Sequence, residues 1–229
     1  MSDKPHHRIG YLSGGPRVST RPSAELTGAR THVISVMKAF EKLGHNVSPY
    51  IVGDRMSQRV SASGSEELIT SNVVRTLAVD VMRLTLSYYN SRKAWQELGN
   101  RVDFVYERLA SMQALGRSFQ RHNIPWVLES NTLFFREAKQ DRRSIVLSGV
   151  ARRIEIAAYH NADLIVAVTD TLRELILRES QITPNKVLVI PNGVDTELFN
   201  PDAYTVTRSY EGFTIGFVGA LYAWQSIDL

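Results

Sequence analysis

Short apolar runs alternate with longer segments of helical periodicity along most of this chain of 229 residues. The run at residues 8–12 (RIGYL) predicts a strand, and apolar residues then recur at helical spacing from Val33 to Leu43. Gly44 is expected to end that helix as a C-terminal glycine, and residues 47–52 form the next predicted strand. A strand, a helix and a strand in this order begin a parallel sheet.

The same alternation continues to about residue 190. Further strands are expected at 103–106, 126–129, 164–168 and 187–190, and helices at 66–98, 110–122, 133–160 (interrupted near Gly149) and 171–179. This regularity predicts an α/β fold with a doubly wound, mainly parallel sheet. In such sheets ligands bind outside the carboxyl ends of the strands, so the loops that follow strands are where a site is expected.

Composition excludes several kinds of site. The chain has no cysteine, which rules out disulfides and thiolate metal sites, and no cluster of His, Asp or Glu has metal-ligand spacing. We therefore expect neither a metal nor a cofactor. No apolar run approaches the ~18 residues of a transmembrane helix, and the polar start of the chain has no secretory signal. A cytoplasmic location is expected, with peripheral membrane contact left open.

The formal net charge of +4 suits several anionic partners and selects none of them. Phosphates, sugar nucleotides and anionic membrane surfaces all remain candidates. Lys and Arg are not interleaved with aromatic residues as single-stranded nucleic acid would favour, so no nucleic-acid partner is expected.

The loop after the first predicted strand contains Gly14, Gly15 and Gly28, the last of them just before a helix. A glycine at a helix N-terminus lets an anion approach the exposed N–H groups. The spacing is not the G-x-G-x-x-G of dinucleotide sites. Two interpretations therefore stand side by side, a phosphate-binding loop and a turn that needs positive φ.

Polar residues follow two predicted strands directly. Glu107 and Arg108 come after one of them, and Glu129 and Asn131 after the next. They are candidates for binding a hydroxylated substrate, and Glu129 for acid–base chemistry. The competing interpretation is an Arg–Glu pair or a helix cap.

Two helices carry further candidates. His32 lies in the first turn of the first predicted helix, where it is either functional or merely structural. The predicted helix at 133–160 is strongly basic, with a solvated, salt-bridged face as one interpretation and contact with anionic lipid or a phosphorylated acceptor as the other. Its basic residues are Arg136, Lys139, Arg142, Arg143, Arg152 and Arg153.

The segment NKVLVIPNGVDTELFNP, at 185–201, is a strand followed by a sharp break. A polar stretch follows, and FTIGFVGAL at 213–221 predicts a new strand. A lone strand cannot bury itself, so this strand is expected to begin a second domain. We expect a first domain at 1–200, a linker at 201–212 and the start of the second domain at 213–229.

Together these stretches resemble the family 4 glycosyltransferases of the GT-B architecture. The stretch VLVIPNGVDTELFNP is similar to the segment that joins their two Rossmann-like domains, and GARTHVISVMKAFEKLGHNV to their first helix and second strand. VDFVYER, IPWVLESN, NADLIVAVTDTLRELILRE and FTIGFVGALYAWQSIDL resemble later elements in the same order. The resemblance implies a retaining, metal-independent hexosyltransferase that uses a nucleotide-diphosphate sugar, with a glycan, lipid-linked or small-molecule acceptor on the N-terminal domain.

The resemblance also implies roles for individual residues. Gly28 and Gly219 match glycines at the donor phosphates. The acceptor side corresponds to His32, Glu107, Arg108, Glu129 and Asn131, and the interdomain segment to Pro191, Asn192, Gly193 and Asp195.

Three departures qualify this resemblance. Relatives carry a histidine where this chain has Glu129, Ser130 and Asn131, so it stays open which of the three takes its role; Glu129 and Asn131 are the catalytic candidates. Ala220 and Gln225-Ser226 stand where relatives have an Arg and a Lys-Gly pair. The Glu-rich donor motif would lie past residue 229.

The sequence therefore predicts the N-terminal portion of a glycosyltransferase that is inactive alone and completed by a C-terminal half, which another chain could supply. The alternative is a non-catalytic α/β module that binds a phosphorylated or glycan ligand.

Overall fold

The computed structural model describes residues 6–56, 73–140, 145–205, 212–213 and 215–216. The chain divides into two compact units, Met1–Ile190 and Pro191–Leu229, which are described separately below.

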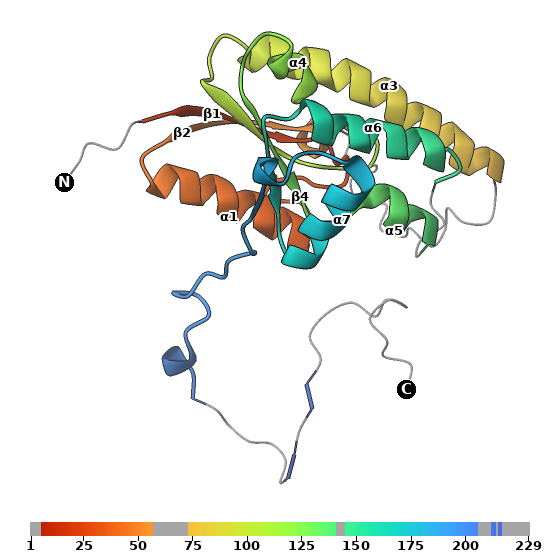
Figure 1. Ribbon diagram of the computed structural model, residues 1–229. Helices are drawn as coiled ribbons and strands as arrows, with labels where there is room; N and C mark the ends of the chain where they lie inside the picture. Colours follow the sequence, from red (N-terminus) through yellow and green to blue (C-terminus); the bar gives the residue numbers. More distant parts are fainter. Residues whose placement is uncertain (1–5, 57–72, 141–144, 206–211, 214, 217–229) are drawn as a thin grey trace. The chain divides into compact units, whose positions relative to one another are not determined.

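The first unit is built on a six-stranded sheet in which every pairing is parallel (Figure 1). The strands are β1 (Arg8–Ser13), β2 (Asn46–Ile51), β3 (Phe104–Arg108), β4 (Trp126–Ser130), β5 (Leu164–Ala167) and β6 (Val187–Val189). Their order in the sheet is β2-β1-β3-β4-β5-β6. The chain thus moves first to one side of β1 and then to the other, and this reversal confirms the predicted doubly wound α/β fold.

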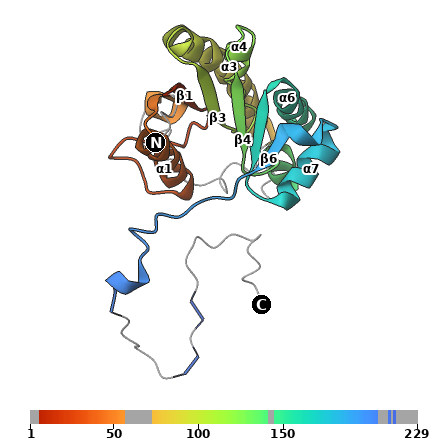
Figure 2. The same cartoon turned by 60° about the vertical axis from the view of Figure 1, so that its left-hand side comes forward.

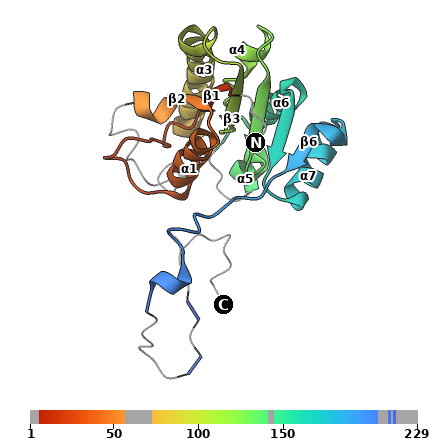
Figure 3. The same cartoon turned by 90° about the vertical axis from the view of Figure 1, so that its left-hand side faces the viewer.

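Helices cover both faces of this sheet (Figures 2 and 3). They are α1 (Gly28–Lys42), α3 (Val73–Leu98), α4 (Arg117–Gln120), α5 (Phe134–Gln140), α6 (Ser148–Asn161) and α7 (Asp170–Ser180), with short 3-10 turns at Val52–Arg55 and Pro184–Lys186. On one face α1 packs through Val33 against Tyr11 and Ile51. On the other face α3, α4, α6 and α7 contribute to a larger apolar core around Trp126 and Leu128.

The ends of α1 form as their residues predict. The Thr27 side chain accepts from the Arg30 backbone N–H at the N-terminus. At the C-terminus Gly44 has a φ of +91°, and its N–H and that of His45 donate to carbonyls of the last turn. This is a Schellman motif, and it confirms Gly44 as the C-terminal glycine.

One helix prediction was wrong, and another was correct apart from the place of its interruption. Residues 110–116 form a loop, so only α4 remains of the helix expected at 110–122, and α5 and α6 replace the helix expected at 133–160. The break falls before Ser148 and leaves Gly149 inside the first turn of α6. The part of the predicted helix at 66–72 lies outside the described residues.

Three buried carboxylates explain where these helices begin. Each accepts hydrogen bonds from two successive backbone N–H groups at or just before the start of a helix in another part of the chain. Glu107 binds Leu115 and Gly116 before α4, Asp80 binds Val146 and Leu147 before α6, and Glu155 binds Phe134 and Phe135 at α5. Such caps satisfy N–H groups that a helix start leaves unpaired. Periodicity along the chain cannot reveal them, because the partners lie 8 to 67 residues apart at no regular spacing.

The second unit contains one 3-10 turn, Pro201–Ala203, among its described residues. The Asp195 carboxylate accepts from the N–H groups of Glu197 and Leu198 and so closes a local turn. Phe213 and residues 215–216 are not in a strand, and the rest of the strand expected at 213–221 lies outside the described residues.

We predict that Gly53→Ala destabilises the first unit by about 3 kcal/mol. A Cβ on Gly53 would lie 2.1 Å from the carbonyl oxygen of Val18, and that backbone cannot move without disturbing the loop after β1. Gly149→Ala is the matched control, since a Cβ there meets nothing within 4 Å. Urea unfolding monitored by circular dichroism measures both variants, and equal stabilities would contradict the prediction.

Candidate functional site

Side chains from three neighbouring strands point to the α1 face of the sheet near its carboxyl edge. Tyr11 of β1 is in register with Tyr106 of β3, and Arg108 of β3 is in register with Glu129 of β4. The rings of Tyr11 and Tyr106 are stacked, with centroids 5.7 Å apart and planes inclined by 24°. Side chains alternate between faces along a strand, so all four residues project to the side that α1 covers.

Glu129 is the centre of this group. Its Oε1 lies 2.7 Å from His32 Nε2 of α1 and accepts from Asn131 Nδ2 at 2.5 Å. Its Oε2 accepts from the Tyr106 hydroxyl at 2.8 Å. Glu129 is 1% exposed, whereas the His32 side chain is 21% exposed. The carboxylate is therefore enclosed, and the imidazole is the member of the group that reaches solvent.

The donors around Glu129 keep it ionised. Burial alone would raise the pKa of this carboxyl, but hydrogen bonds from His32, Tyr106 and Asn131 outweigh burial and lower the pKa below its ordinary value of 4.5. Burial and the charge of Glu129 raise the pKa of Tyr106 well above its usual range, so its hydroxyl stays a neutral donor. A carboxylate that cannot readily take a proton is suited to orient His32 rather than to act as the acid or base itself.

Glu107 and Ser130 are adjacent in sequence to Arg108 and Glu129, but their side chains point to the opposite face of the sheet. Glu107 is 0% exposed, and burial raises its pKa to about 7 although the backbone N–H groups of Gly116 and Leu115 act to lower it. Ser130 is also 0% exposed, and its hydroxyl lies 2.9 Å from that of Tyr159 on α6. Both side chains support the core and present nothing to a ligand at this edge, so Glu107 holds the loop before α4 and is not placed to contact an acceptor.

The sequence profile of Glycosyltransferase Family 4 matches residues 26–198. The chain belongs to this family. The match includes α1, β3 and β4, the elements that carry His32, Arg108 and Glu129. The glycosyltransferase fold assigned from the sequence is thus confirmed together with the parallel sheet.

One solved structure with a similar backbone is the glycosyltransferase from Rickettsia africae ESF-5, at 17% sequence identity and a TM-score of 0.46. The similarity covers 88% of this chain and 47% of that one, so the chain spans about half the length of that protein. A comparison with curated proteins found no match.

The other residues expected at the glycosyltransferase site are placed as follows. Gly28 is the first residue of α1, and a Cβ there would meet nothing within 4 Å, which leaves its backbone open to a ligand. Gly219 lies outside the described residues. Pro191, Asn192, Gly193 and Asp195 are exposed within the second unit. The roles of these residues stay predictions.

The basic segment at 133–160 forms ion pairs where it is described. Arg136 and Arg152, from α5 and α6, approach the Glu179 carboxylate of α7 at 3.9 Å and 3.2 Å. These contacts favour the salt-bridged interpretation for that face. Arg142 and Arg143 lie outside the described residues, as does the side chain of Lys139.

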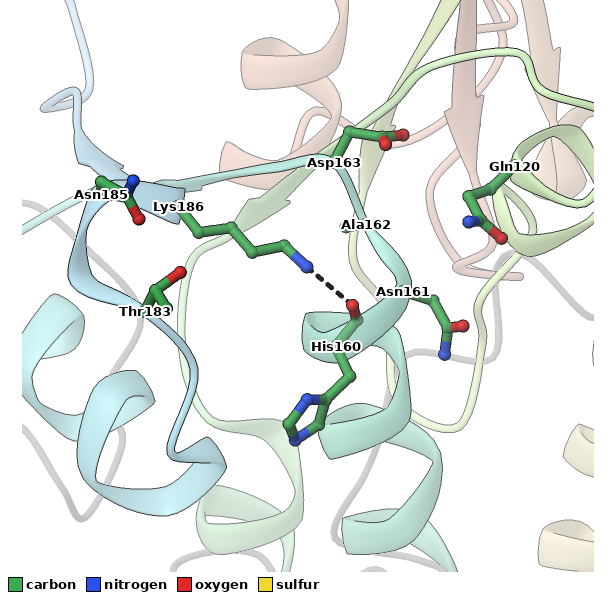
Figure 4. A pocket seen from close by; sticks show the side chains of 8 residues that line it. All are labelled: Gln120, His160, Asn161, Ala162, Asp163, Thr183, Asn185 and Lys186. Carbon is green, nitrogen blue, oxygen red and sulfur yellow. Dashed lines mark hydrogen bonds between the residues drawn. The ribbon is translucent and has the colours of Figure 1, made fainter.

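A separate polar pocket of about 490 Å³ lies where α6 leads into β5 and where β6 begins (Figure 4). Lys186, which lines it, donates to the His160 carbonyl oxygen at 2.6 Å, and the Asp163 carboxylate accepts from the Trp126 backbone N–H. Because strand starts lie at the opposite edge from strand ends, this pocket is not part of the site around Glu129. Among the described residues, no group of three or more His, Asp or Glu could hold a metal, and no helix is long and apolar enough to cross a membrane.

We predict that Glu129→Gln lowers the free energy of unfolding at neutral pH by about 2 kcal/mol, because the amide presents an N–H group where donors converge. The folded-state pKa of Glu129 lies below 4.5, so its contribution is present above that pH and is lost as the pH falls through the folded value. The two proteins should therefore converge in stability in acid.

The exposed Glu41 of α1 provides the control. Glu41→Gln should change stability by less than about 0.5 kcal/mol at any pH. Denaturant titrations from neutral to acidic pH measure all three proteins. A difference between wild type and Glu129→Gln that stays constant into acid would show that the carboxylate is not the stabilising form.

Proposed function

We propose that this chain is the acceptor-side portion of a retaining hexosyltransferase that uses a nucleotide-diphosphate sugar. Its membership of glycosyltransferase family 4 supports glycosyl transfer. The observation that carries the proposal is the enclosed Glu129 carboxylate, which holds His32 at the carboxyl edge of the sheet. This is the edge at which doubly wound sheets bind their ligands.

His32 is the residue that we place against the acceptor. If its Nε2–H donates to Glu129, its Nδ1 presents a lone pair, and Nδ1 has no hydrogen-bond partner within the described part of the chain. That lone pair can accept a hydrogen bond from the acceptor hydroxyl and orient its oxygen. Glu129 is then a positioning residue, and Asn131 and Tyr106 hold it in place.

Transfer forms a bond between the acceptor oxygen and the anomeric carbon and breaks the bond from that carbon to the diphosphate oxygen. The hydroxyl proton passes to the leaving diphosphate or, through His32, to solvent. We propose that Gly28 lets the backbone at the start of α1 approach the donor phosphates, whose negative charge the helix N-terminus favours.

The donor is proposed to bind mainly to a C-terminal half that begins near Gly219. On this proposal the 229 residues alone bind an acceptor but catalyse poorly, need no metal or cofactor, and act in the cytoplasm. The acceptor is a glycan, a lipid-linked or a small hydroxylated molecule. A non-catalytic binding module would instead show no transfer with any C-terminal half.

We predict that His32→Ala lowers kcat for sugar transfer by about 100-fold in a protein that includes the C-terminal half. His160→Ala is the matched control, because His160 is exposed at the end of α6, where the strands begin. Release of nucleoside diphosphate with acceptor present measures both variants. Unchanged kcat in His32→Ala would remove His32 from the mechanism, and full activity of the 229 residues alone would refute the two-half proposal.

The outer face of α3 supports the peripheral membrane contact that the sequence left open. Apolar side chains are exposed along it, although this helix is part of the folded unit; they are Val73, Val74, Leu77, Val81, Met82, Tyr88 and Tyr89. Arg92 lies over the Tyr88 ring and Lys93 over the Tyr89 ring. The only acidic residues of α3 are Asp80, which is buried, and Glu97, which is paired with Arg55. Exposed apolar, tyrosine and cationic side chains together suit an anionic lipid surface.

We predict that the chain sediments with vesicles that contain phosphatidylserine and far less with neutral phosphatidylcholine vesicles. Replacing Val74 and Val81 by Asp should abolish sedimentation without changing secondary structure, because both side chains are at least half exposed. Replacing Glu41 and Lys38 of α1 by Gln controls for surface changes elsewhere. If the Asp variant binds the vesicles as well as the wild type does, this face does not contact the membrane. If the wild type dimerises with rising concentration and the Asp variant does not, the face is a dimer interface.

A further inference from the structure

Arg108 has a positive charge that the described protein leaves unpaired. No ion pair and no hydrogen bond joins Arg108 to any residue in the described ranges, although Glu129 is its register partner on β4. Both oxygens of Glu129 are already taken by His32, Asn131 and Tyr106. Arg108 is half-buried, and its Nε is enclosed without a hydrogen-bond partner in the described chain.

Two further unpaired hydroxyls lie on β1, the strand next to that of Arg108. Ser13 of β1 is the register partner of Arg108 on its other side, and Tyr11 lies two residues earlier on the same face. The hydroxyls of Tyr11 and Ser13 are buried and have no partner in the described chain. Leaving such groups unpaired costs about 1–3 kcal/mol each, so each of them calls for a partner, and a bound ligand can supply one.

These atoms cluster along two strands, although Gln113 lies toward the opposite face, where its amide donates to the Arg83 carbonyl of α3. Seven buried side-chain atoms lack a partner in the described ranges, and five belong to β1, to β3 or to the loop that follows β3. The five residues are Tyr11, Ser13, Arg108, Ser111 and Gln113. The loops after β1 and β3 are in contact, since a Cβ on Gly14 would lie 2.7 Å from the Cβ of Gln113. A cation, two hydroxyls and adjoining loops thus border the Glu129 site on its β1 side.

We propose that Arg108, with the hydroxyls of Ser13 and Tyr11, forms a subsite for an anionic group of the acceptor, a phosphate monoester or a carboxylate. The inference rests on the proposed function and adds to it the charge of the acceptor. Arg binds such groups through paired N–H donors, which neither hydroxyl could replace. An anion here would hold the acceptor close to His32, because His32 is bound to Glu129 on β4, the strand next to that of Arg108.

The first experiment tests binding with inorganic phosphate on the 229-residue chain. Phosphate should raise the Tm of the wild type relative to sodium chloride at equal ionic strength, and Arg108→Gln should lose the rise while Arg108→Lys keeps part of it. Arg121→Gln, at an exposed site after α4, should retain it fully. Without phosphate, Arg108→Gln should be as stable as the wild type or more so, because it removes an unpaired, partly buried charge.

A second measurement does not depend on a folded variant. In protein with 15N-labelled arginine, the Nε–H signal of Arg108 should shift and saturate with phosphate. A signal that does not move, a Tm rise that survives Arg108→Gln, or a strongly destabilised Arg108→Gln without ligand would each overturn the subsite.

The source of the anion is decided with sugars and with a nucleotide. Glucose 6-phosphate or glucuronate should bind the chain more tightly than glucose, and Arg108→Gln should erase the difference. If Arg108→Gln instead abolishes binding of UDP and leaves the sugar series unchanged, the group belongs to the donor diphosphate and the acceptor assignment falls.

Kinetics with a C-terminal half present separates this inference from the proposed function. Arg108→Gln should raise KM for a charged acceptor by about 10- to 100-fold and change kcat/KM for a neutral acceptor by less than about threefold. Transfer that proceeds equally to both acceptors in both proteins would preserve the function and refute the subsite. Phosphate binding at Arg108 without transfer to any acceptor would preserve the subsite and refute the function.

Discussion

The enclosed carboxylate of Glu129 is the interaction on which the site depends. It joins α1 through His32, β3 through Tyr106, and the turn after β4 through Asn131. A buried carboxylate without donors would take up a proton or destabilise the fold, so these three groups keep it charged. The same bonds hold His32 at the edge of the sheet where a substrate can reach it.

Other buried carboxylates of the domain perform a different task with the same chemistry. Glu107, Asp80 and Glu155 each bind two successive backbone N–H groups at helix starts, and burial raises the pKa of Glu107 and of Glu155 to about 7. These acids fix the loops that follow β3 and β4, between which the candidate site lies. Glu129 differs from them because it binds no backbone N–H of a helix start: its donors are three side chains, one of which is partly exposed.

Much of the architecture could be predicted from the sequence. Periodicity located all six strands to within a few residues, and the order of strands and helices was sufficient for a parallel, doubly wound sheet. The helix boundaries in 110–160 could not be predicted, since they depend on caps from Glu107, Asp80 and Glu155, whose contacts with these loops form only in the folded domain.

The candidate site was only partly predictable for a related reason. Glu107 and Arg108 looked like one polar pair after a strand, yet both belong to β3 and point to opposite faces. Ser130 and Glu129 likewise point to opposite faces of β4. Tyr11 and Tyr106 were not predicted, because they stand in apolar runs that read as core. Tyr106 lies two residues before Arg108 and therefore on the same face of the strand, and this spacing is the sequence signal that could have identified it.

The sequence by itself determined the family, the parallel sheet and the short set of polar residues at the strand ends, because these follow from local periodicity and residue type. The tertiary structure decided which of those residues share a site. Strand register places Ser13, Arg108 and Glu129 side by side, and α1 brings His32 across 97 positions of sequence to Glu129. It also decided that Glu129 is paired and Arg108 is not, since pairing depends on the distances between side chains, which only the packed sheet and helix set.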